Sequence, residues 1–585
     1  MKKIIYIMAC GLLLGLTSCQ DTFLDLDPQD TRSDVVYFKK ASHFNEYANG
    51  FYGQLIGWQS RYGTIYSYMD GSSDLSTYFG YSSDVGRGAI QVTTNDDRWN
   101  KCYENIRTVN ILLEKAKSYP GSQAEIQQYL SEAYFFRAYT YFYLLKFFGG
   151  VPVVTTVLDV NSPELYGPRN SRYQVVDLIL ADLDKAFEGV PKEQNIPAAE
   201  KGRISHYGAK AFKARVLLYE ATWRKYNGTS TDYEGSAGPA SDQVNAFLGE
   251  AITLSDDVIS NGGYVTWNHN GVSSMQRMSN RYLFNLEDAD SNPGGLTKAS
   301  NNEFIIYGVY DKGLRPGSIN LNQTLQKMDV SRKLMDMFVC TDGLPIEKST
   351  RFQGYQNPGD EFQYRDNRMK SYVYEPASDA VLKDGRSGYK SAKFVATNRS
   401  NLEESANYPV LRLAEVYLTY AEALYERNGN ITDAQLSRSV NILRNRAGVA
   451  NLTNDLVTNN GLDMLTEIRR ERTVEMYMEG CRFDDLKRWG IAEQELNQSR
   501  CGMVVGGTNY PTVFVDASGT PTDRYAKNTY VWGEEKVQTK YGLLNCTLLD
   551  SKTNYNFKKM HYLWPIPQRQ IDLNSSLKQN RGYTN

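Results

Sequence analysis

Apolar residues recur every three to four positions in residues 99–113 and again in residues 122–147. This spacing places them along one face of a helix. The second stretch begins with Ser122 and Glu125 in a capping-box pattern and ends at two glycines, which is a normal C-terminal stop. Because a Pro-Gly dipeptide separates the two stretches, the pattern predicts two helices that form a hairpin.

Three further units of the same kind follow along the chain. Alanine and aromatic residues lie about one turn apart in them, which lets neighbouring helices approach closely. Paired helices of this composition resemble tetratricopeptide repeats, although their period is not a regular one of about 34 residues. We therefore predict a mainly α fold with four degenerate tetratricopeptide-like helix pairs. The further predicted units are residues 173–187 with 205–219, residues 413–427 with 432–447, and residues 462–488.

Long insertions of a different composition separate the helix pairs. Residues 52–97, 262–322 and 503–541 are rich in Gly, Ser, Asn, Asp and Tyr. We expect loops with a few short strands there, one of them in the apolar run at residues 304–309. Loops longer than about 15 residues within a domain are usually functional when they are ordered.

The N-terminus predicts an exported lipoprotein. Two lysines precede an apolar run at residues 4–16, which is too short to span a bilayer as a helix. The run ends in Leu-Thr-Ser directly before Cys19, which resembles the bacterial lipobox. We expect residues 1–18 to be a signal peptide, Cys19 to be acylated and residues 19–35 to form a tether; the alternative is an ordinary signal cleaved nearby. No later segment approaches the ~20 apolar residues of a membrane helix, so the lipid is the expected membrane contact.

Composition excludes some partners and favours others. The net charge is -2 and no Lys/Arg block is present, which argues against a nucleic-acid partner. Tyrosine is unusually frequent, 43 residues against 22 Phe and 7 Trp. Because tyrosine has an apolar ring and a polar tip, this number favours a recognition surface. The five cysteines after Cys19 are widely spaced and form no disulfide framework, although one bridge is open and the sequence does not choose its pair.

Enzyme motifs are missing from the sequence. It contains no G-x-S-x-G, H-E-x-x-H, P-loop or G-x-G-x-x-G pattern, and its four histidines are scattered without metal-ligand spacing. We therefore expect no catalytic residue, no cofactor and no metal beyond a structural calcium ion. A glycosidase needs only two carboxylates about 5 to 10 Å apart, and composition alone leaves that reading open.

Six strings now combine into a recognisable pattern. They include Lys-Phe-Phe-Gly-Gly-Val-Pro-Val at the end of the first hairpin and Trp-Pro-Ile-Pro near the C-terminus. Each string is weak alone, but all six occur in order after a lipobox. The strings lie within residues 136–153, 202–215, 409–423, 445–448, 471–490 and 564–583.

In this order the strings resemble the RagB/SusD family of nutrient-binding outer-membrane lipoproteins. The resemblance implies one SusD-like domain over residues 36–585, with an N-terminal part at 36–230 and a C-terminal part at 300–585. It also implies a non-catalytic protein on the cell surface. Such proteins act as a lid on a TonB-dependent, SusC-like outer-membrane barrel and pass it oligosaccharides, and some members bind peptides instead. The fold alone does not set the ligand.

Most charged residues of the six strings are expected to be structural. We predict that they form ion pairs and caps between packed helices, because a buried pair of that kind fixes geometry. The residues concerned are Arg137, Arg412, Glu415, Arg446, Glu471 and Arg472.

A sugar site needs aromatic faces and planar polar groups, and the first two insertions supply both. Related proteins place their sites between these two regions. Trp58 and Trp267 lie in polar loops without apolar periodicity and are the stronger candidates, whereas Trp99 fits core packing equally well. Asp70 and Asp74 fit turn residues or calcium ligands as well as sugar ligands. The candidate ligand-binding residues are Trp58, Tyr62, Asp70, Asp74, Tyr81, Trp99, Trp267, Tyr282, Tyr307, Arg315 and Asn320.

Three functions remain in competition. The first is capture of a glycan for a partner transporter, which the Trp- and Tyr-rich loops favour. The second, capture of peptides within the same family, favours a deep cleft with charged groups. The third is a surface glycoside hydrolase, which turnover of polysaccharides would reveal.

Overall fold

The computed structural model describes most of the chain after the tether. Residues 1–35, which hold the predicted signal peptide and tether, lie outside the described residues, as do Tyr62, Tyr81 and Asn320 of the predicted site. In the described part, no helix is both long and apolar enough to cross a membrane. The described residues are 37–58, 70–78, 83–317, 328–357, 359–374, 387–395, 403–504 and 532–584.

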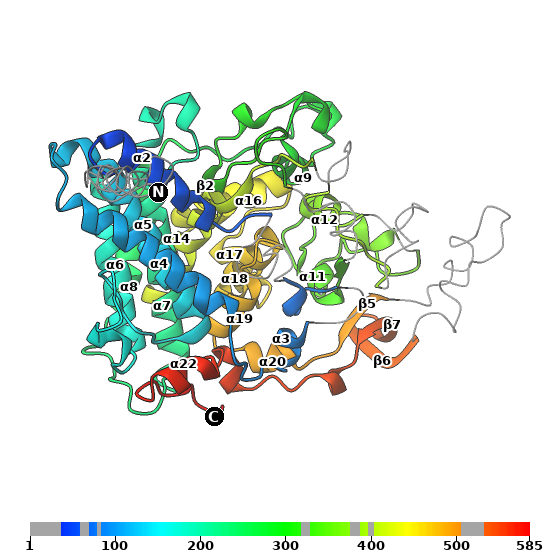
Figure 1. Cartoon of the computed structure of the whole chain (residues 1–585). Helices are drawn as coiled ribbons and strands as arrows, with labels where there is room; N and C mark the ends of the chain where they lie inside the picture. The colour runs from blue at the N-terminus through cyan, green and yellow to red at the C-terminus, as the bar shows by residue number, and fades with distance from the viewer. Residues whose placement is uncertain are drawn as a thin grey trace, which may run out of the picture.

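Long helices pack side by side into one half of the molecule, on the left of Figure 1. Helix α5 packs between α4 and α6, and α8 packs between α7 and α14. Five of these helices coincide with predicted ones, whereas α8 has no predicted counterpart. The long helices are α4 (Asp97–Ala116), α5 (Gln123–Phe148), α6 (Arg172–Gly189), α7 (His206–Asn227), α8 (Val244–Asn261) and α14 (Leu413–Asn428).

Shorter helices, joined by 3-10 turns and loops, make up much of the rest of the fold. Most of the shorter helices of the C-terminal half lie to the right of the long helices in Figure 1. They are α2 (Ala41–Asn49), α3 (Asp84–Arg87), α9 (Ser279–Tyr282), α11 (Arg332–Met337), α12 (Asn367–Tyr372), α15 (Asp433–Ser437), α16 (Val440–Ala447), α17 (Asn454–Asn459), α18 (Met464–Glu475), α19 (Arg482–Arg488), α20 (Ala492–Leu496) and α22 (Gln568–Leu573).

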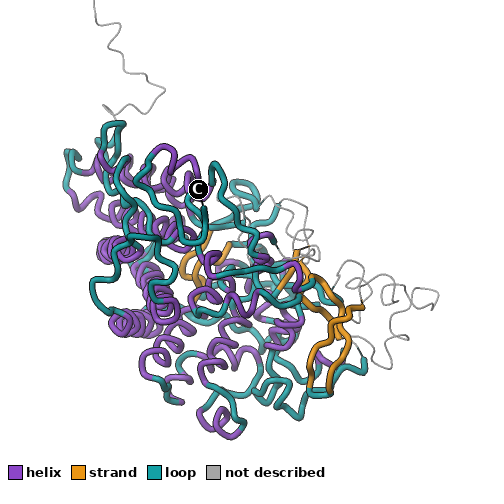
Figure 2. Tube along the Cα trace, turned by 90° about the horizontal axis from the view of Figure 1, so that it is seen from below, coloured by secondary structure: helices purple, strands orange, loops and turns teal. Residues whose placement is uncertain are grey.

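The described strands are short and pair in three small antiparallel sheets, drawn in orange in Figure 2. Strand β2 coincides with the predicted apolar strand of the middle insertion. The mainly α fold with few short strands is therefore confirmed. The pairs are β1 (Ser76–Tyr78) with β3 (Met328–Val330), β2 (Phe304–Gly308) with β4 (Tyr408–Arg412), and β7 (Gly542–Asp550) between β5 (Arg500–Val504) and β6 (Trp532–Thr539).

One predicted helix is broken in the structure, because residues 432–447 form α15 and α16. The predicted unit over residues 462–488 forms the two helices α18 and α19, with a break between them. The second break contains Met478 and Gly480, both with positive φ, which end the helical path. The predicted capping box at α5 is also wrong. Ser122 does cap the helix, but Glu125 accepts a hydrogen bond from the Tyr119 hydroxyl instead.

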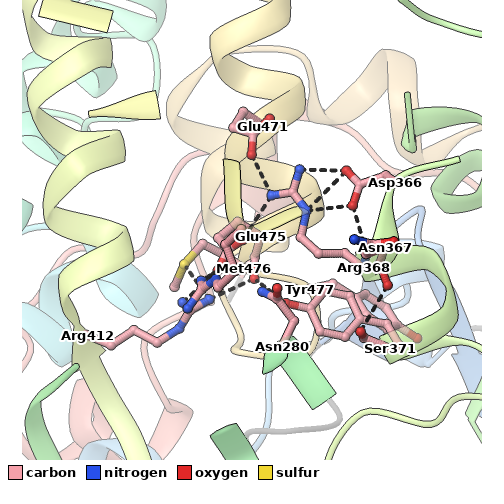
Figure 3. Close-up of polar contacts among 12 residues, drawn as sticks. Asn280, Asp366, Asn367, Arg368, Ser371, Arg412, Glu471, Glu475, Met476 and Tyr477 are labelled. Atoms are coloured by element: carbon pink, nitrogen blue, oxygen red, sulfur yellow. Dashed lines mark hydrogen bonds and ion pairs between the residues drawn. The ribbon is translucent and has the colours of Figure 1, made fainter. Parts of the chain in front are cut away.

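A buried network of charges joins the two halves of the fold. The carboxylate of Glu475 accepts hydrogen bonds from Arg412 at 2.7 Å, from Arg446 at 2.6 Å and from Arg368 at 2.9 Å. Arg412 also binds Glu303 and Glu479. Figure 3 shows Arg412 on one side of Glu475 and Arg368 on the other, with Asp366 and Glu471 beyond.

The arginines determine the charge state of Glu475. Burial raises the pKa of a carboxyl group, but Arg446, Arg412 and Arg368 lower the pKa of Glu475 well below its usual value. The carboxylate therefore stays ionised inside the core. Replacing any one of the three arginines would leave an uncompensated charge there.

The other predicted structural charges also form pairs. Arg137 donates two hydrogen bonds to Asp182, and Arg472 binds Asp485 at 2.8 Å. Glu415 accepts a hydrogen bond from the Arg215 guanidinium at 2.8 Å. The prediction that the charged residues of the strings are structural is confirmed, because their partners lie on other packed helices and loops.

Glu422 provides a test of this kind of pairing. Its carboxylate accepts hydrogen bonds from Arg488 at 2.6 and 2.8 Å and from the Trp489 indole at 2.6 Å. Burial raises the pKa of Glu422, but Arg488, together with Arg472 and Arg469, outweighs burial and brings the pKa to about 2. A carboxyl pKa below its unfolded value stabilises the fold above the unfolded pKa, and this stability is lost as the pH falls toward 2.

We predict that Glu422→Gln lowers the free energy of unfolding at pH 7 by about 3 kcal/mol. The deficit should shrink as the pH falls from about 4.5 toward 2, because the wild-type carboxylate then becomes protonated. Thermal or denaturant unfolding across this pH range measures both effects. Glu104→Gln, which changes an exposed carboxylate, should leave stability unchanged at every pH. A deficit for Glu422→Gln that is constant with pH would contradict the pairing argument.

Candidate functional site

A groove of about 310 Å³ opens between helix α2 and the segment that follows β2. It lies where the start of the first insertion meets the middle insertion, and the loop before α7 closes its third side. We call this the α2 groove. Its lining residues include Asn45, Asn49, Tyr52, Leu55, Glu200, Lys201, Gly202, Arg203, Tyr307, Val309 and Arg315.

Two contacts fix the loop before α7 against the groove, the hydrogen bonds of Arg203 and the close approach of Gly202 to Val309. Arg203 binds both carboxylate oxygens of Glu132 at 3.0 Å and also donates to the side-chain oxygen of Asn49. Gly202 has φ +102, and a Cβ there would lie 2.3 Å from a methyl carbon of Val309. Only glycine therefore allows the loop to approach the segment after β2 so closely.

Two tyrosines present rings and hydroxyls at the groove. The Tyr52 hydroxyl accepts a hydrogen bond from the Ile204 backbone N–H at 2.9 Å. Tyr307 is half-buried, and its hydroxyl has no hydrogen-bond partner among the described residues. Burial, followed by the nearby Glu193, raises the pKa of Tyr307 to about 12. The hydroxyl therefore stays protonated at neutral pH and can both donate and accept a hydrogen bond.

Further polar groups are available in the groove. The side-chain oxygen of Asn45 is buried and has no partner among the described residues. Arg315 is exposed, and it lies at the end of a tight turn that it closes by backbone hydrogen bonds with Asp311. Its guanidinium lies 4.7 Å from the Tyr310 ring and donates to the Val309 carbonyl at 3.1 Å. The remaining guanidinium donors are thus held beside the groove.

These groups suit a ligand that carries many hydroxyls. A hydroxyl both donates and accepts, and the groove offers an acceptor in Asn45, a donor in Arg315 and both in Tyr307. Among the described lining residues Glu200 is the only carboxylate. Glycoside hydrolysis uses a pair of carboxylates, which the described part of the groove does not supply.

Two family models match most of the chain. One, for the SusD family, matches residues 374–583. The other, described as "Starch-binding associating with outer membrane", matches residues 22–218. The chain belongs to the SusD/RagB family.

Two relatives match over about four fifths of the chain, and a third matches over a shorter stretch. A SusD-like protein of Bacteroides ovatus is 23% identical and covers 84% of this chain and 83% of its own. SusD-like protein P38 of Formosa agariphila is 25% identical and covers 81% of this chain and 89% of its own. The starch-binding protein SusD of Bacteroides thetaiotaomicron is 29% identical over 30% of this chain and 21% of its own.

Solved structures show the same fold. A SusD-like carbohydrate binding protein from Bacteroides fragilis superimposes with a TM-score of 0.68 at 22% identity, over 92% of this chain and 99% of the other. A laminarin binding SusD-like protein superimposes with a TM-score of 0.60 at 19% identity, over 93% and 99% of the two chains.

The two stronger tryptophan candidates of this SusD-family protein are buried. Trp58 is fully buried, and its indole N–H donates to the Ala406 carbonyl at 2.7 Å. Its ring packs edge-to-face against Tyr408 and Phe394. The expectation that Trp58 and Trp267 are exposed in polar loops is wrong, because both side chains are buried and both indole N–H groups donate to the protein.

Trp267 shows the same behaviour within the middle insertion. Its side chain is buried, and the indole N–H donates to the Ser300 hydroxyl at 3.1 Å. Its backbone N–H donates to Glu303, one of the carboxylates that bind Arg412. The middle insertion is thereby tied to the buried charge network.

The remaining candidates are divided between the core and the groove. Trp99 packs edge-to-face on Phe148, which confirms the core-packing alternative, and Tyr282 is also buried. Tyr307 and Arg315 both line the α2 groove. The structure therefore brings two of the described candidates together and leaves the other described candidates in the core.

Asp70 and Asp74 are buried structural residues. Asp74 binds Arg482 at 2.7 and 2.8 Å, and Asp70 accepts a hydrogen bond from the Met478 N–H. The Asp70 carbonyl also accepts from the Ser73 N–H, as in a turn. Burial raises the pKa of Asp70 to about 7. Within the described residues no group of three or more His, Cys, Asp or Glu side chains could hold a metal ion, so the calcium alternative finds no support there.

Several groove residues were missed by reading the sequence. Asn45 and Asn49 lie on α2, which no predicted helix covers. Gly202 and Arg203 belong to a family string that the sequence reading treated as structural. The available signal was Gly202 before a charged residue in a loop, which marks a close backbone approach.

Among the cysteines, Cys102, Cys340 and Cys481 are free thiols.

We predict that Trp58→Ala lowers the free energy of unfolding by about 3 to 5 kcal/mol, because it leaves a cavity in the core. Trp58→Phe should keep enough packing to fold, and its ligand affinity should stay within about twofold of wild type. Thermal unfolding and affinity electrophoresis through a gel that retards the wild type measure these outcomes. Loss of retardation by Trp58→Phe with an unchanged melting temperature would show instead that the indole contacts the ligand.

Proposed function

We propose that this protein captures an oligosaccharide at the cell surface through the α2 groove and delivers it to a TonB-dependent outer-membrane barrel without chemical change. The observation that carries the proposal is the set of unpaired polar groups at the groove, the Tyr307 hydroxyl and the Asn45 oxygen beside the exposed Arg315 guanidinium. Family membership and the carbohydrate-binding relatives support the same ligand class.

The α2 groove fits a sugar better than a strongly apolar ligand. Its tyrosine rings offer apolar edges, and its amides, hydroxyls and guanidinium surround them. A sugar hydroxyl exchanges a hydrogen bond to water for one to protein, so each contact gives a small net gain. The affinity of one such site should therefore be weak, and long glycans that reach the groove repeatedly should be retained better than short ones.

The predicted acylation of Cys19 would place the protein at the outer membrane. With Cys19 in the outer membrane and the domain outside the cell, the groove meets glycans before the barrel does. The transporter would supply uptake, and this protein would supply capture. The outer-membrane description of the matching family model supports this placement.

We predict that Tyr307→Ala and Arg315→Ala each weaken glycan binding about five- to tenfold, because each removes one or two hydrogen bonds from the site. Affinity electrophoresis of the domain without Cys19 measures this in gels that contain starch, laminarin and other plant, fungal and bacterial polysaccharides. Arg315→Ala should change stability little, since Arg315 is exposed. Tyr307→Ala also removes ring packing on the core, so its melting temperature is measured beside its affinity.

Matched controls separate the groove from the rest of the surface. Tyr166→Ala removes a tyrosine that is 59% exposed and does not line the groove, and Arg569→Ala removes an exposed arginine elsewhere. Both should bind as wild type does. Binding of peptides but of no glycan would favour the peptide-capturing alternative, and release of sugar products by the pure protein would favour the hydrolase.

We predict that Cys19→Ser moves the protein from the outer-membrane fraction to the soluble fraction, because the serine cannot carry the acyl chains that anchor it. Fractionation of cells followed by immunoblotting measures the change. The wild-type domain should be digested by protease added to intact cells. Membrane retention of Cys19→Ser would contradict the lipoprotein assignment.

A further inference from the structure

A second cavity, of about 230 Å³, lies near the C-terminus, where the chain meets the loop that follows α7. Figure 1 shows the C-terminus and α22 at the opposite end of the long helices from α2, so this cavity is separate from the α2 groove. We call it the C-terminal cavity. Its lining includes Thr231, Lys559, Met560, Arg581 and Gly582.

The C-terminal family string builds a fixed wall of this cavity. The Asn580 amide donates to the Phe148 and Trp564 carbonyls at 3.1 and 2.7 Å and accepts from Arg169 at 2.9 Å. Gly582 has φ +87, and a Cβ there would lie 2.7 Å from the Met560 Cβ. The backbone around Arg581 is therefore held in place on both sides.

Three groups at the cavity can donate hydrogen bonds. Lys559 donates one bond to Asn227 and lies 4.1 Å from the Tyr562 ring, and an ammonium has three donors. Arg581 is exposed and forms no side-chain hydrogen bond to a described residue. Thr231 is 7% exposed, and its hydroxyl has no hydrogen-bond partner among the described residues.

The charges around the cavity are unequal. Its described lining contains two cations and no carboxylate. Two acids act on these cations from outside the lining. Asp232 interacts with Arg581 but accepts a hydrogen bond from the Tyr173 hydroxyl at 2.9 Å, and Glu493 interacts with Lys559. The described lining therefore offers hydrogen-bond donors and positive charge, and it contains no carboxylate that would compete for them.

We propose that the C-terminal cavity binds a tetrahedral oxyanion, the sulfate or phosphate group of an ester. Arg581 and Lys559 supply charge-assisted hydrogen bonds to two of its oxygens, and the Thr231 hydroxyl donates to a third. Such a group occurs on sulfated or phosphorylated glycans and on lipid headgroups, and both share this chemistry. The site does not depend on ligand binding in the α2 groove.

The probe is N-acetylglucosamine 6-sulfate, compared with unsulfated N-acetylglucosamine in 150 mM NaCl, a buffer salt that screens weak surface attraction. Isothermal titration calorimetry should show binding of the sulfated sugar alone. Arg581→Gln should weaken it about tenfold, and Thr231→Val about threefold. Thr231→Val should not lower the melting temperature, because the hydroxyl that it removes has no partner to lose.

Matched controls use equivalent residues elsewhere. Thr77→Val also removes a buried hydroxyl without a described partner, and Arg569→Gln removes another exposed arginine. Both should bind the sulfated sugar as wild type does. The cavity variants change no residue that lines the α2 groove, so failure of the α2 groove proposal would leave this result unchanged.

A second arm identifies the source of the oxyanion. The protein without Cys19 is sedimented with phosphatidylcholine vesicles that contain or lack phosphatidic acid. Binding to phosphatidic acid that Arg581→Gln and Thr231→Val both weaken supports the site with a lipid headgroup as its ligand. Binding of neither probe, or equal binding by wild type and both cavity variants, would overturn the proposal.

Discussion

The buried carboxylate of Glu475 is the constraint on which the fold depends. It binds Arg412 at the start of α14, Arg446 on α16 and Arg368 on α12, so one residue fixes three segments far apart in the sequence. Burying four charges carries a large desolvation cost, which only complete pairing offsets. Each partner is therefore required once the others are in place. The network links the long helices to the irregular C-terminal half.

The same network lies at the break between α18 and α19, the two helices of the predicted unit over residues 462–488. Arg412 donates to the carbonyl of Glu475, the last residue of α18, as well as to the Glu479 carboxylate. Met478 then adopts a positive φ, and its N–H donates to Asp70 of the first insertion. The break in the helix thus attaches the first insertion to the core and accounts for the burial of Asp70.

The proposed ligand contacts use polar groups that the fold leaves without partners. Most charged side chains in the core pair with one another, and the side chain of Asn580 uses both its donors and its acceptor within the protein. Buried polar groups without a described partner occur at several places in the fold, and two of them border a cavity, Asn45 at the α2 groove and Thr231 at the C-terminal cavity. An unpaired buried polar group costs free energy, and beside an open cavity a ligand can supply the missing hydrogen bond.

The sequence alone determined the mainly α fold, five of the long helices and the structural role of the charged strings, because helical periodicity and capping are local properties. It also placed Tyr307 and Arg315 in a loop region that contributes to the α2 groove. The burial of Trp58 and Trp267, the break at Met478 and the meeting of α2 with the segment after β2 were decided by tertiary structure. Most of these features depend on partners hundreds of residues away, and the burial of Trp267 depends on Ser300 and Glu303 across its own insertion; no local pattern identifies such partners. A polar loop composition predicts an exposed ring only when no distant segment packs over it.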